Sequence, residues 1–528
     1  MKTIKYYISK LEKLLSGLRD LGAGSGKLHR ILRGMIKFSS FIKNHKILIF
    51  ILILGSFLRM YNAREYLSFG YDQDVASWFT FDVLKNHHLR LVGQETTTLG
   101  IFIGPLYYYL LTFYYFIFNM SPFGGIYLNL FLGVFSIWSF YYIFLKIFEK
   151  QNLAEMAAFI YAISFSLVSN DRLSNPTTPM ILWGIWYLYS LYLLLKKSKK
   201  APILIGLLIG LIWHINFSLL IPLVLIPVTL KLRTKKLDYK EVNNLIISTF
   251  LFTFPFWLFE LRHGFIQVKS FVDAFLLIQI SPVSIGIHFG KVYNMFNQIV
   301  TTLVIYPKSR YYFVLPLLLM LYLLYLIRKK MIDKNLGIIL FIWPLPFILF
   351  FSLYTKQVSE NYLNGSLVVF ILLITFLFHK LLTNINLRLY GLIIFIVFFV
   401  SNIKHVISIP YPLNGYQQKT LLLQFIKSDA QVRGYPCVSI SFISEPGTNF
   451  GYRYLYYLNN LRVNNPKRGS PVYTIVYPIN DSLYPSNRAF GSIGLIYPDY
   501  DRYNIKDVER TCQGTDDNML EPILGLPM

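Results

Sequence analysis

Charged residues are scarce in this chain. Only 15% of its 528 residues are Asp, Glu, Lys or Arg and 55% are hydrophobic, whereas soluble proteins carry about 25% charged residues. Cysteine is almost absent, and two residues exclude a scaffold built on many disulfides. Walker, HExxH and GxSxG motifs are missing, and no internal repeat is evident. These absences exclude an ordinary soluble domain and leave no familiar catalytic signature.

The apolar residues are instead concentrated in about 11–12 segments, most of them near the roughly 20 residues needed to cross a bilayer. The first is not a cleavable signal, because it lies too deep in the chain and no small-residue cleavage site follows it. We therefore predict an all-α polytopic membrane protein. Its apolar runs lie at 46–61, 101–119, 123–147, 153–169, 177–195, 202–214, 216–230, 244–259, 311–328, 336–354, 363–379 and 387–403.

Basic clusters indicate which ends of these runs face the cytoplasm. Residues 1–46 hold eleven Lys or Arg and two acids, which places the N-terminus in the cytoplasm by the positive-inside rule. Working outward from later clusters places residues 62–100, 169–176, 259–310, 354–362 and everything after 403 outside. The net charge of +25 is thus a topology signal rather than a sign of nucleic-acid binding.

One inconsistency remains in this scheme. Three apolar runs separate residues 62–100 from 169–176, although an even number of crossings must connect two outer segments. One of the three is therefore re-entrant or interfacial, and the run 101–119 is a candidate.

The composition changes after residue 403. Residues 404–528 hold twelve basic and ten acidic residues and no run long enough to span. Helix-like pieces (QQKTLLLQFIKSD, FGYRYLYYLNNL) alternate there with strand-like pieces (CVSISFI, PVYTIVYP). We predict a basic cytoplasmic segment (1–45), a polytopic transmembrane domain (46–403) and a small extracytoplasmic α/β domain (404–528).

The two cysteines both lie in this last segment. The compartment outside the cytoplasm permits disulfides, so we predict that Cys437 and Cys512 are bonded, with Cα atoms within about 7 Å of each other. Two unpaired thiols are the alternative, since two positions alone do not reveal a pairing.

Three acids stand near the outer ends of apolar runs. The stretch FGYDQDVASW (69–78) carries Asp72 and Asp74 just after the first run, and Glu95 precedes the run 101–119. The residues after Asp74 have the amphipathic pattern of a helix on the membrane surface. A carboxylate held there, partly out of water, is suited to act as a general base or to bind a cation. A solvated loop is the alternative for each acid.

Polar residues also mark the later outer ends. The planar guanidinium of Arg172 is suited to hold a phosphate, although it could equally snorkel to headgroups. The cluster FELRHGF (259–265) could be an interfacial salt-bridge group, and His214 alone indicates a structural residue. The candidate substrate-binding residues are Asp171, Arg172, Asn175, Glu260, Arg262, His263, Lys356 and Tyr362.

The order of these motifs resembles a known group. GYDQD, GIFIGPLYYYLL, NDRLSNP and FELRHGF, spread over residues 45–403, resemble bacterial membrane glycosyltransferases of the GT-C fold. The protein O-mannosyltransferase and aminoarabinose-transferase-like families are the most similar. In place of the family's Asp-Glu pair, Gln73 here separates two aspartates.

The resemblance implies a polyprenyl-phosphate sugar donor, an inverting transfer outside the cytoplasm and an acidic catalytic residue in the first outer loop. By position, Asp72 takes that role and Glu95 precedes the family's second span. Asp171 or Arg172 matches the polar loop near the lipid phosphate.

We therefore expect a glycosyltransferase of a bacterial-type plasma membrane. Its partners would be the lipid-linked donor, a protein or a lipid or glycan acceptor, and membrane lipids, with no nucleic acid. No cofactor and no metal ligands are assigned, although a divalent cation is compatible with the acids. A transporter or flippase for lipid-linked sugars is the main alternative, and a non-catalytic assembly protein is another.

Overall fold

The computed structural model describes residues 45–96, 98–276, 282–306, 314–354, 358–445, 449–480 and 482–513. The predicted basic segment 1–45 lies almost entirely outside these residues, as do Lys356 and the start of the run 311–328. The chain divides into two compact units, Met1–Leu54 and Gly55–Met528. All contacts given below lie within the second unit.

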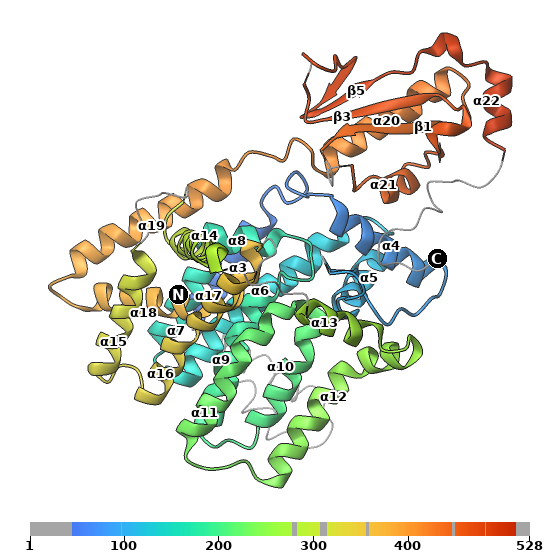
Figure 1. Cartoon of the computed structure of the whole chain (residues 1–528). Coiled ribbons are helices and arrows are strands. Elements are labelled where there is room, and N and C mark those ends of the chain that lie inside the picture. The colour runs from blue at the N-terminus through green and yellow to red at the C-terminus, as the bar shows by residue number, and fades with distance from the viewer. Residues whose placement is uncertain are drawn as a thin grey trace, which may run out of the picture. The chain divides into compact units, whose positions relative to one another are not determined.

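Helices dominate the apolar part of the chain (Figure 1). Several start at sequence signals, such as Asp238, whose side chain accepts from Glu241 N at 2.7 Å and caps α12. The elements are α3 (Lys46–Met60), α4 (Tyr71–Lys85), α5 (Leu106–Ile117), α6 (Gly124–Phe148), α7 (Gln151–Ile163), α8 (Phe165–Arg172), α9 (Met180–Leu195), α10 (Ala201–Ile215), η1 (Phe217–Val224), α11 (Leu225–Arg233), α12 (Tyr239–Arg262), α13 (Ile266–Leu276), α14 (Pro282–Thr302), α15 (Leu315–Arg328), α16 (Lys334–Ile342), α17 (Pro344–Leu353), η3 (Glu360–Ser366), α18 (Leu367–Thr383) and α19 (Arg388–Ser408).

Among the described residues, five helical stretches are long and apolar enough to cross a membrane: α6, α12, α16 with α17, η3 with α18, and α19. The pair α7 and α8 qualifies as one further span, bent by 62° at Ser164. Helices α9, α10 and α15 are apolar but shorter. Helices α10 and α12 lie side by side. The predicted polytopic helical architecture is confirmed.

The run 101–119 forms only a short helix. Helix α5 has 12 residues, about 18 Å at roughly 1.5 Å per residue, which is well short of the ~30 Å hydrocarbon core. The residues before it are extended, because Phe102 pairs with Glu95 in an antiparallel β-bridge. This length is consistent with the interpretation that 101–119 does not cross, which stays a prediction.

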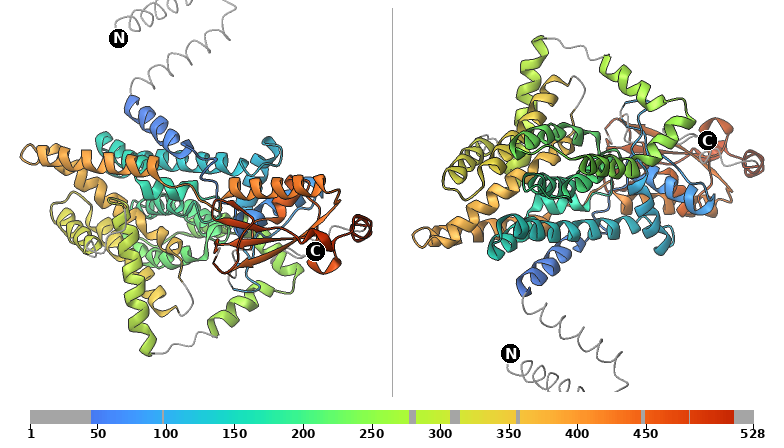
Figure 2. Two further views of the ribbon diagram at one scale, coloured as in Figure 1. Left: turned by 90° about the horizontal axis from the view of Figure 1, so that it is seen from above. Right: turned by 90° about the horizontal axis from the view of Figure 1, so that it is seen from below.

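The C-terminal α/β region (residues 416–513) contains the predicted helices and strands. Its five-stranded sheet has the order β2-β1-β3-β5-β4, with β1 parallel to β2 and β3, and β5 antiparallel to β3 and β4. Helix α20 lies along the sheet (Figures 1 and 2). The elements are α20 (Tyr416–Val432), β1 (Val438–Ser444), α21 (Arg453–Leu458), β2 (Val463–Asn464), η4 (Pro466–Arg468), β3 (Val472–Tyr477), β4 (Arg488–Phe490), β5 (Ile493–Ile496), η5 (Tyr500–Arg502) and α22 (Ile505–Thr511).

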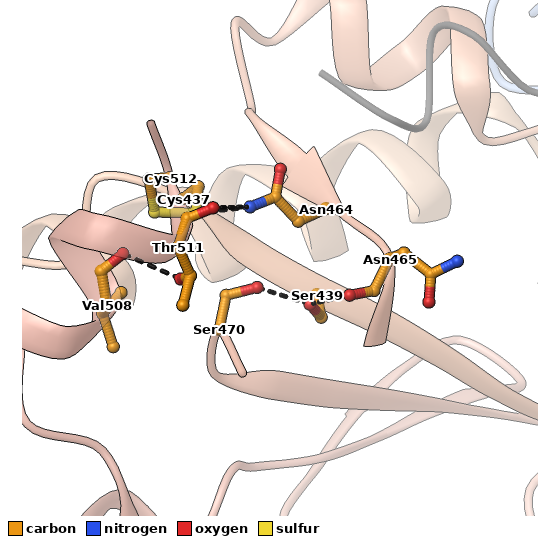
Figure 3. Close-up of a disulfide and its surroundings, with 8 residues drawn as sticks. All are labelled: Cys437, Ser439, Asn464, Asn465, Ser470, Val508, Thr511 and Cys512. Atoms are coloured by element: carbon orange, nitrogen blue, oxygen red, sulfur yellow. Dashed lines mark hydrogen bonds between the residues drawn. A yellow bond between two sulfur atoms is a disulfide. The ribbon is translucent and has the colours of Figure 1, made fainter. Parts of the chain in front are cut away.

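The predicted disulfide is confirmed. Cys437, just before β1, is bonded to Cys512 at the end of α22, with the two Cα atoms 5.8 Å apart (Figure 3). Asn464 beside it donates to Thr511 O at 3.1 Å. The crosslink closes a loop of about 75 residues. By lowering the conformational entropy of the unfolded chain, it should stabilise the folded state by about 4 kcal/mol.

Candidate active site at the start of α4

Two of the predicted outer segments, 62–100 and 169–176, meet in the folded chain. Gln73 of α4 donates through Nε2 to Ser174 O at 2.9 Å, and Asn364 of η3 donates to Asn170 Oδ1 at 3.1 Å. The backbone of Phe102 accepts from the indole of Trp213 at 2.9 Å. These contacts bring together segments that are up to 194 residues apart in sequence.

Asp72 lies in the first turn of α4. Gln94 Nε2 donates to its Oδ1 at 3.1 Å, and among the described residues Gln94 is the only hydrogen-bond donor to this carboxylate. Burial raises the pKa of Asp72, while the Gln94 hydrogen bond acts in the opposite direction. A carboxylate that is largely desolvated yet sparsely hydrogen-bonded is a stronger proton acceptor than one in water.

The start of α4 is fixed by local and tertiary contacts. Gln73 Oε1 accepts from Gly70 N at 2.9 Å and so satisfies the backbone N–H of the residue that precedes α4. One face of α4 is buried, and Phe79 packs on the ring of Tyr108 in α5 with centroids 5.0 Å apart. These contacts present Asp72 at the helix end next to residues 91–104 and the 170–178 loop.

Asp74 has a different environment from Asp72. Its side chain is buried, and its Oδ1 accepts from the backbone N–H of Tyr454, the second residue of α21, at 2.9 Å. Burial raises the pKa of Asp74 to about 6, and the Tyr454 N–H and the nearby Lys419 oppose that rise. The carboxylate thus satisfies a helix N-terminus, and we withdraw the hypothesis that it takes part in catalysis.

Glu95 is engaged within its own loop. Its Oε1 accepts from Gly100 N at 2.6 Å, and its backbone pairs with Phe102. The Glu95 side chain therefore stabilises the turn next to Gln94, the residue that donates to Asp72. The structure gives Glu95 a structural task in the candidate site.

Asp171 forms a buried ion pair that was not predicted from the sequence. Its Oδ2 accepts from Arg59 Nε at 2.9 Å and from Nη2 at 2.7 Å, and Tyr161 donates to Oδ1 at 3.1 Å. Arg59 is 2% exposed and Asp171 3%. Because its lone pairs are occupied, Asp171 is better explained as a structural residue than as the predicted substrate contact.

Arg172 and Asn175 are also held by the protein. Arg172 Nη2 donates to Leu58 O and, at 2.9 Å, to Tyr61 O, and its guanidinium lies 5.1 Å from the centroid of the Tyr66 ring. Arg172 Nε is buried without a hydrogen-bond partner among the described residues. Asn175 accepts from two threonines of its own turn, Thr177 at 2.8 Å and Thr178 at 3.1 Å. A free phosphate contact of Arg172 is therefore limited to the remaining guanidinium nitrogens.

The cluster at the end of α12 separates into occupied and open residues. Glu260 is fully buried, and its carboxylate accepts from Gln267 N at 3.3 Å and Val268 N at 3.1 Å, which caps α13. His263 Nδ1 lies 2.8 Å from Phe259 O, and the two rings stack. Arg262 is exposed and has no partner among the described residues. Of this predicted group, Glu260 is enclosed, while Arg262 and the Nε2 edge of the exposed His263 are accessible to a ligand.

The remaining candidates are quickly placed. Tyr362 stacks on Phe351 with centroids 5.8 Å apart, and Lys356 lies outside the described residues. His214 is structural, as predicted: its Nδ1 accepts from Leu106 N at 3.2 Å at the start of α5, and its Nε2 bonds to Phe252 O.

Several residues that shape the site were missed from the sequence. Gln94 stands beside the predicted Glu95 and gave no signal of its own. Arg59 did give a signal in the sequence, because an arginine at the end of an apolar run requires a partner for its charge. Lys419 of α20 gave none, since a lysine on an amphipathic helix is ordinarily exposed.

No metal ligand group is found in the part of the chain that the structure describes. No three His, Cys, Asp or Glu side chains gather there in an arrangement suited to a metal ion.

Comparisons with known proteins agree with this architecture. A family profile described as dolichyl-phosphate-mannose-protein mannosyltransferase matches residues 103–258. None of the curated proteins matches the sequence. The crystal structure of ArnT from Cupriavidus metallidurans bound to undecaprenyl phosphate is similar at a TM-score of 0.55 and 10% identity, covering 86% of this chain and 98% of that one. Its apo form gives a TM-score of 0.55 and 10% identity over 88% and 99%.

At this level of identity the likeness establishes the fold. The match extends over 98% of the ArnT chain and 86% of this one. This protein therefore has the GT-C fold of membrane glycosyltransferases.

Proposed function

We propose that this protein is a membrane glycosyltransferase that moves a sugar from a polyprenyl-phosphate donor to a hydroxyl acceptor. The fold, the match of residues 103–258 to a mannosyltransferase profile and the undecaprenyl phosphate bound to the similar ArnT support this class of reaction. The acceptor is a protein or a lipid or glycan. The single observation that carries the mechanism is the partly buried, sparsely hydrogen-bonded carboxylate of Asp72.

The proposed step is a direct displacement with inversion. The acceptor oxygen attacks the anomeric carbon and transfers its proton to Asp72. The bond between that carbon and the phosphate oxygen breaks, and the polyprenyl phosphate leaves with the electron pair. A protonated Asp72 and an inverted glycoside remain, and the proton is then released to water.

The leaving phosphate requires a positive partner, because negative charge develops on its oxygen as the bond to the sugar breaks, and fixed cations stabilise such charge strongly. Arg262 is exposed and unpaired among the described residues, and Arg172 is only partly buried, with Nη2 bonded to two backbone carbonyls. We propose both as phosphate contacts, together with Lys356.

The location follows from the topology. If α5 does not cross, the basic clusters all fall on one side and the candidate site on the other. We propose that the N-terminus is cytoplasmic and that the site and the C-terminal α/β region face outward in a bacterial-type plasma membrane. At this boundary a lipid-borne donor meets a water-borne acceptor.

The test compares two aspartates on one helix. Asp72→Asn removes the base, so transfer from a panel of polyprenyl-phosphate hexoses and pentoses should fall about 10²–10⁴-fold, with binding of the polyprenyl phosphate retained. Asp74→Asn is the matched control, because its amide oxygen can still accept from Tyr454 N. Wild-type turnover in Asp72→Asn would remove this residue from the mechanism. Donor binding without any sugar transfer by the wild type would instead favour a carrier of lipid-linked sugars.

A further inference from the structure

The short segment that leads into α4 is held by the C-terminal α/β region. Its two carbonyls at Leu67 and Phe69 accept from Tyr416 N at 2.9 Å and from Lys419 Nζ at 2.8 Å. Both donors lie in the first turn of α20. This contact joins parts of the chain that are 350 residues apart.

Lys419 is unusually placed for a lysine. It is 5% exposed, and its ammonium also donates to Phe450 O at 2.9 Å and Gly451 O at 3.5 Å, with the Tyr452 ring centroid 4.2 Å away. Burying an ammonium is costly unless its donors are satisfied. Here each of the three donors finds a carbonyl, which makes the contact geometrically specific as well as strong.

The facing loop approaches so closely that only glycine fits. Gly451 has φ +85°, and a Cβ at this position would lie 2.5 Å from Phe69 O and 2.8 Å from Lys419 Nζ. A side chain here would therefore push directly on the segment before α4.

A second anchor follows Asp72. Asp74 accepts from Tyr454 N at 2.9 Å, and the Trp78 ring meets the Tyr454 ring edge-on at 5.7 Å. Asp72 thus stands between an anchor three residues earlier and an anchor two residues later, and both belong to the C-terminal α/β region.

We infer that the C-terminal α/β region positions the segment that carries Asp72 (residues 67–74), and that Lys419 is a positioning residue for Asp72. Displacing a reacting group by about 1 Å can cost on the order of 10²-fold in rate. The inference rests on the proposed function where it concerns activity, but the contact itself can be tested without any turnover.

The test uses two lysines of the same helix in the full-length protein. Lys419→Met keeps the apolar stem and removes the donors. Its kcat for sugar transfer should fall tenfold or more, while the donor KM changes less than twofold. Amide hydrogen exchange of residues 67–74 should rise at the same time. Lys427→Met is the control, because Lys427 Nζ also donates to a carbonyl, Asn459 O at 2.8 Å, but within the C-terminal region.

A glycine pair covers the case in which Lys419→Met does not fold. Gly451→Ala adds one methyl group against Phe69 O and removes no hydrogen bond. Gly469→Ala is matched, because Gly469 has φ +89° but its Cβ would meet nothing closer than 3.6 Å. We expect faster exchange of residues 67–74 and lower kcat in Gly451→Ala only.

The outcomes separate the two proposals. Unchanged exchange and kcat in Lys419→Met and Gly451→Ala would overturn the positioning role, as would equal losses in the control variants. Faster exchange of residues 67–74 in a protein whose wild type transfers no sugar would support the positioning contact and reject the proposed function.

Discussion

Two aspartates at the same end of the molecule have nearly opposite surroundings. Asp171 accepts two hydrogen bonds from Arg59 and one from Tyr161, and it is completely enclosed. Asp72 has one amide donor, Gln94, at 3.1 Å. The difference shows that burial alone does not mark a reactive acid. What matters is whether the protein has already used the lone pairs that a substrate proton would need.

The arginines repeat the contrast. Arg172 donates through Nη2 to two backbone carbonyls and lies over the Tyr66 ring. Arg262, by contrast, is exposed and unpaired among the described residues. The more buried residue of each pair is the more fully engaged, so its removal should affect stability first. Removal of the open residue should affect function first.

The largest expected effect is on the occupied acid. Asp171→Ala leaves the Arg59 guanidinium buried and uncompensated, which should lower the free energy of unfolding by about 3–5 kcal/mol. Asp72→Ala should leave it within about 0.5 kcal/mol, because no ion pair is lost. Denaturant unfolding of both variants in detergent would measure this. Similar losses in the two variants would end the contrast between occupied and open acids.

The next effect concerns the open arginine. Arg262→Ala should weaken binding of a polyprenyl phosphate about tenfold or more, as expected for a lost charge-assisted contact, with unfolding unchanged. Arg502→Ala is a suitable control, because Arg502 is an exposed arginine of the C-terminal α/β region that pairs with Asp499 at 2.7 Å. A donor titration identical to that of the control variant would show that Arg262 does not contact the phosphate.

The smallest effect sharpens the environment of Asp72. A general base acts only when ionised, so kcat/KM should rise as pH increases through the pKa of Asp72. Burial raises that pKa, so this limb should lie at higher pH than for an ordinary aspartate. Gln94→Leu removes the hydrogen bond that favours the ionised form, so the limb should move further up. The control is Gln431→Leu, because Gln431 is exposed. If the pH dependence of kcat/KM is the same in Gln94→Leu and in this control, the rise with pH belongs to a group other than Asp72.

The helical architecture could be predicted from the sequence because it depends on local patterns. Apolar runs and alternating strand residues predicted the apolar helices and strands β1 and β3, while the shared side of the outer segments stays a prediction. The short α5 was recognisable only as a conflict in the number of crossings. The residues before it form an extended pairing with Glu95 rather than helix, and pairing of that kind is not visible in hydropathy.

Hydrophobic run length and charge placement are local properties, so the sequence predicts apolar helices with acids and arginines near their ends. Which of these acids and arginines are free depends on the tertiary structure. Asp74 and Glu260 cap helices, Asp171 neutralises Arg59, and Lys419 reaches across 350 residues to Phe69 O. These roles depend on hydrogen bonds between segments distant in the chain, and a buried charge must take whichever partner the packing brings within about 3 Å.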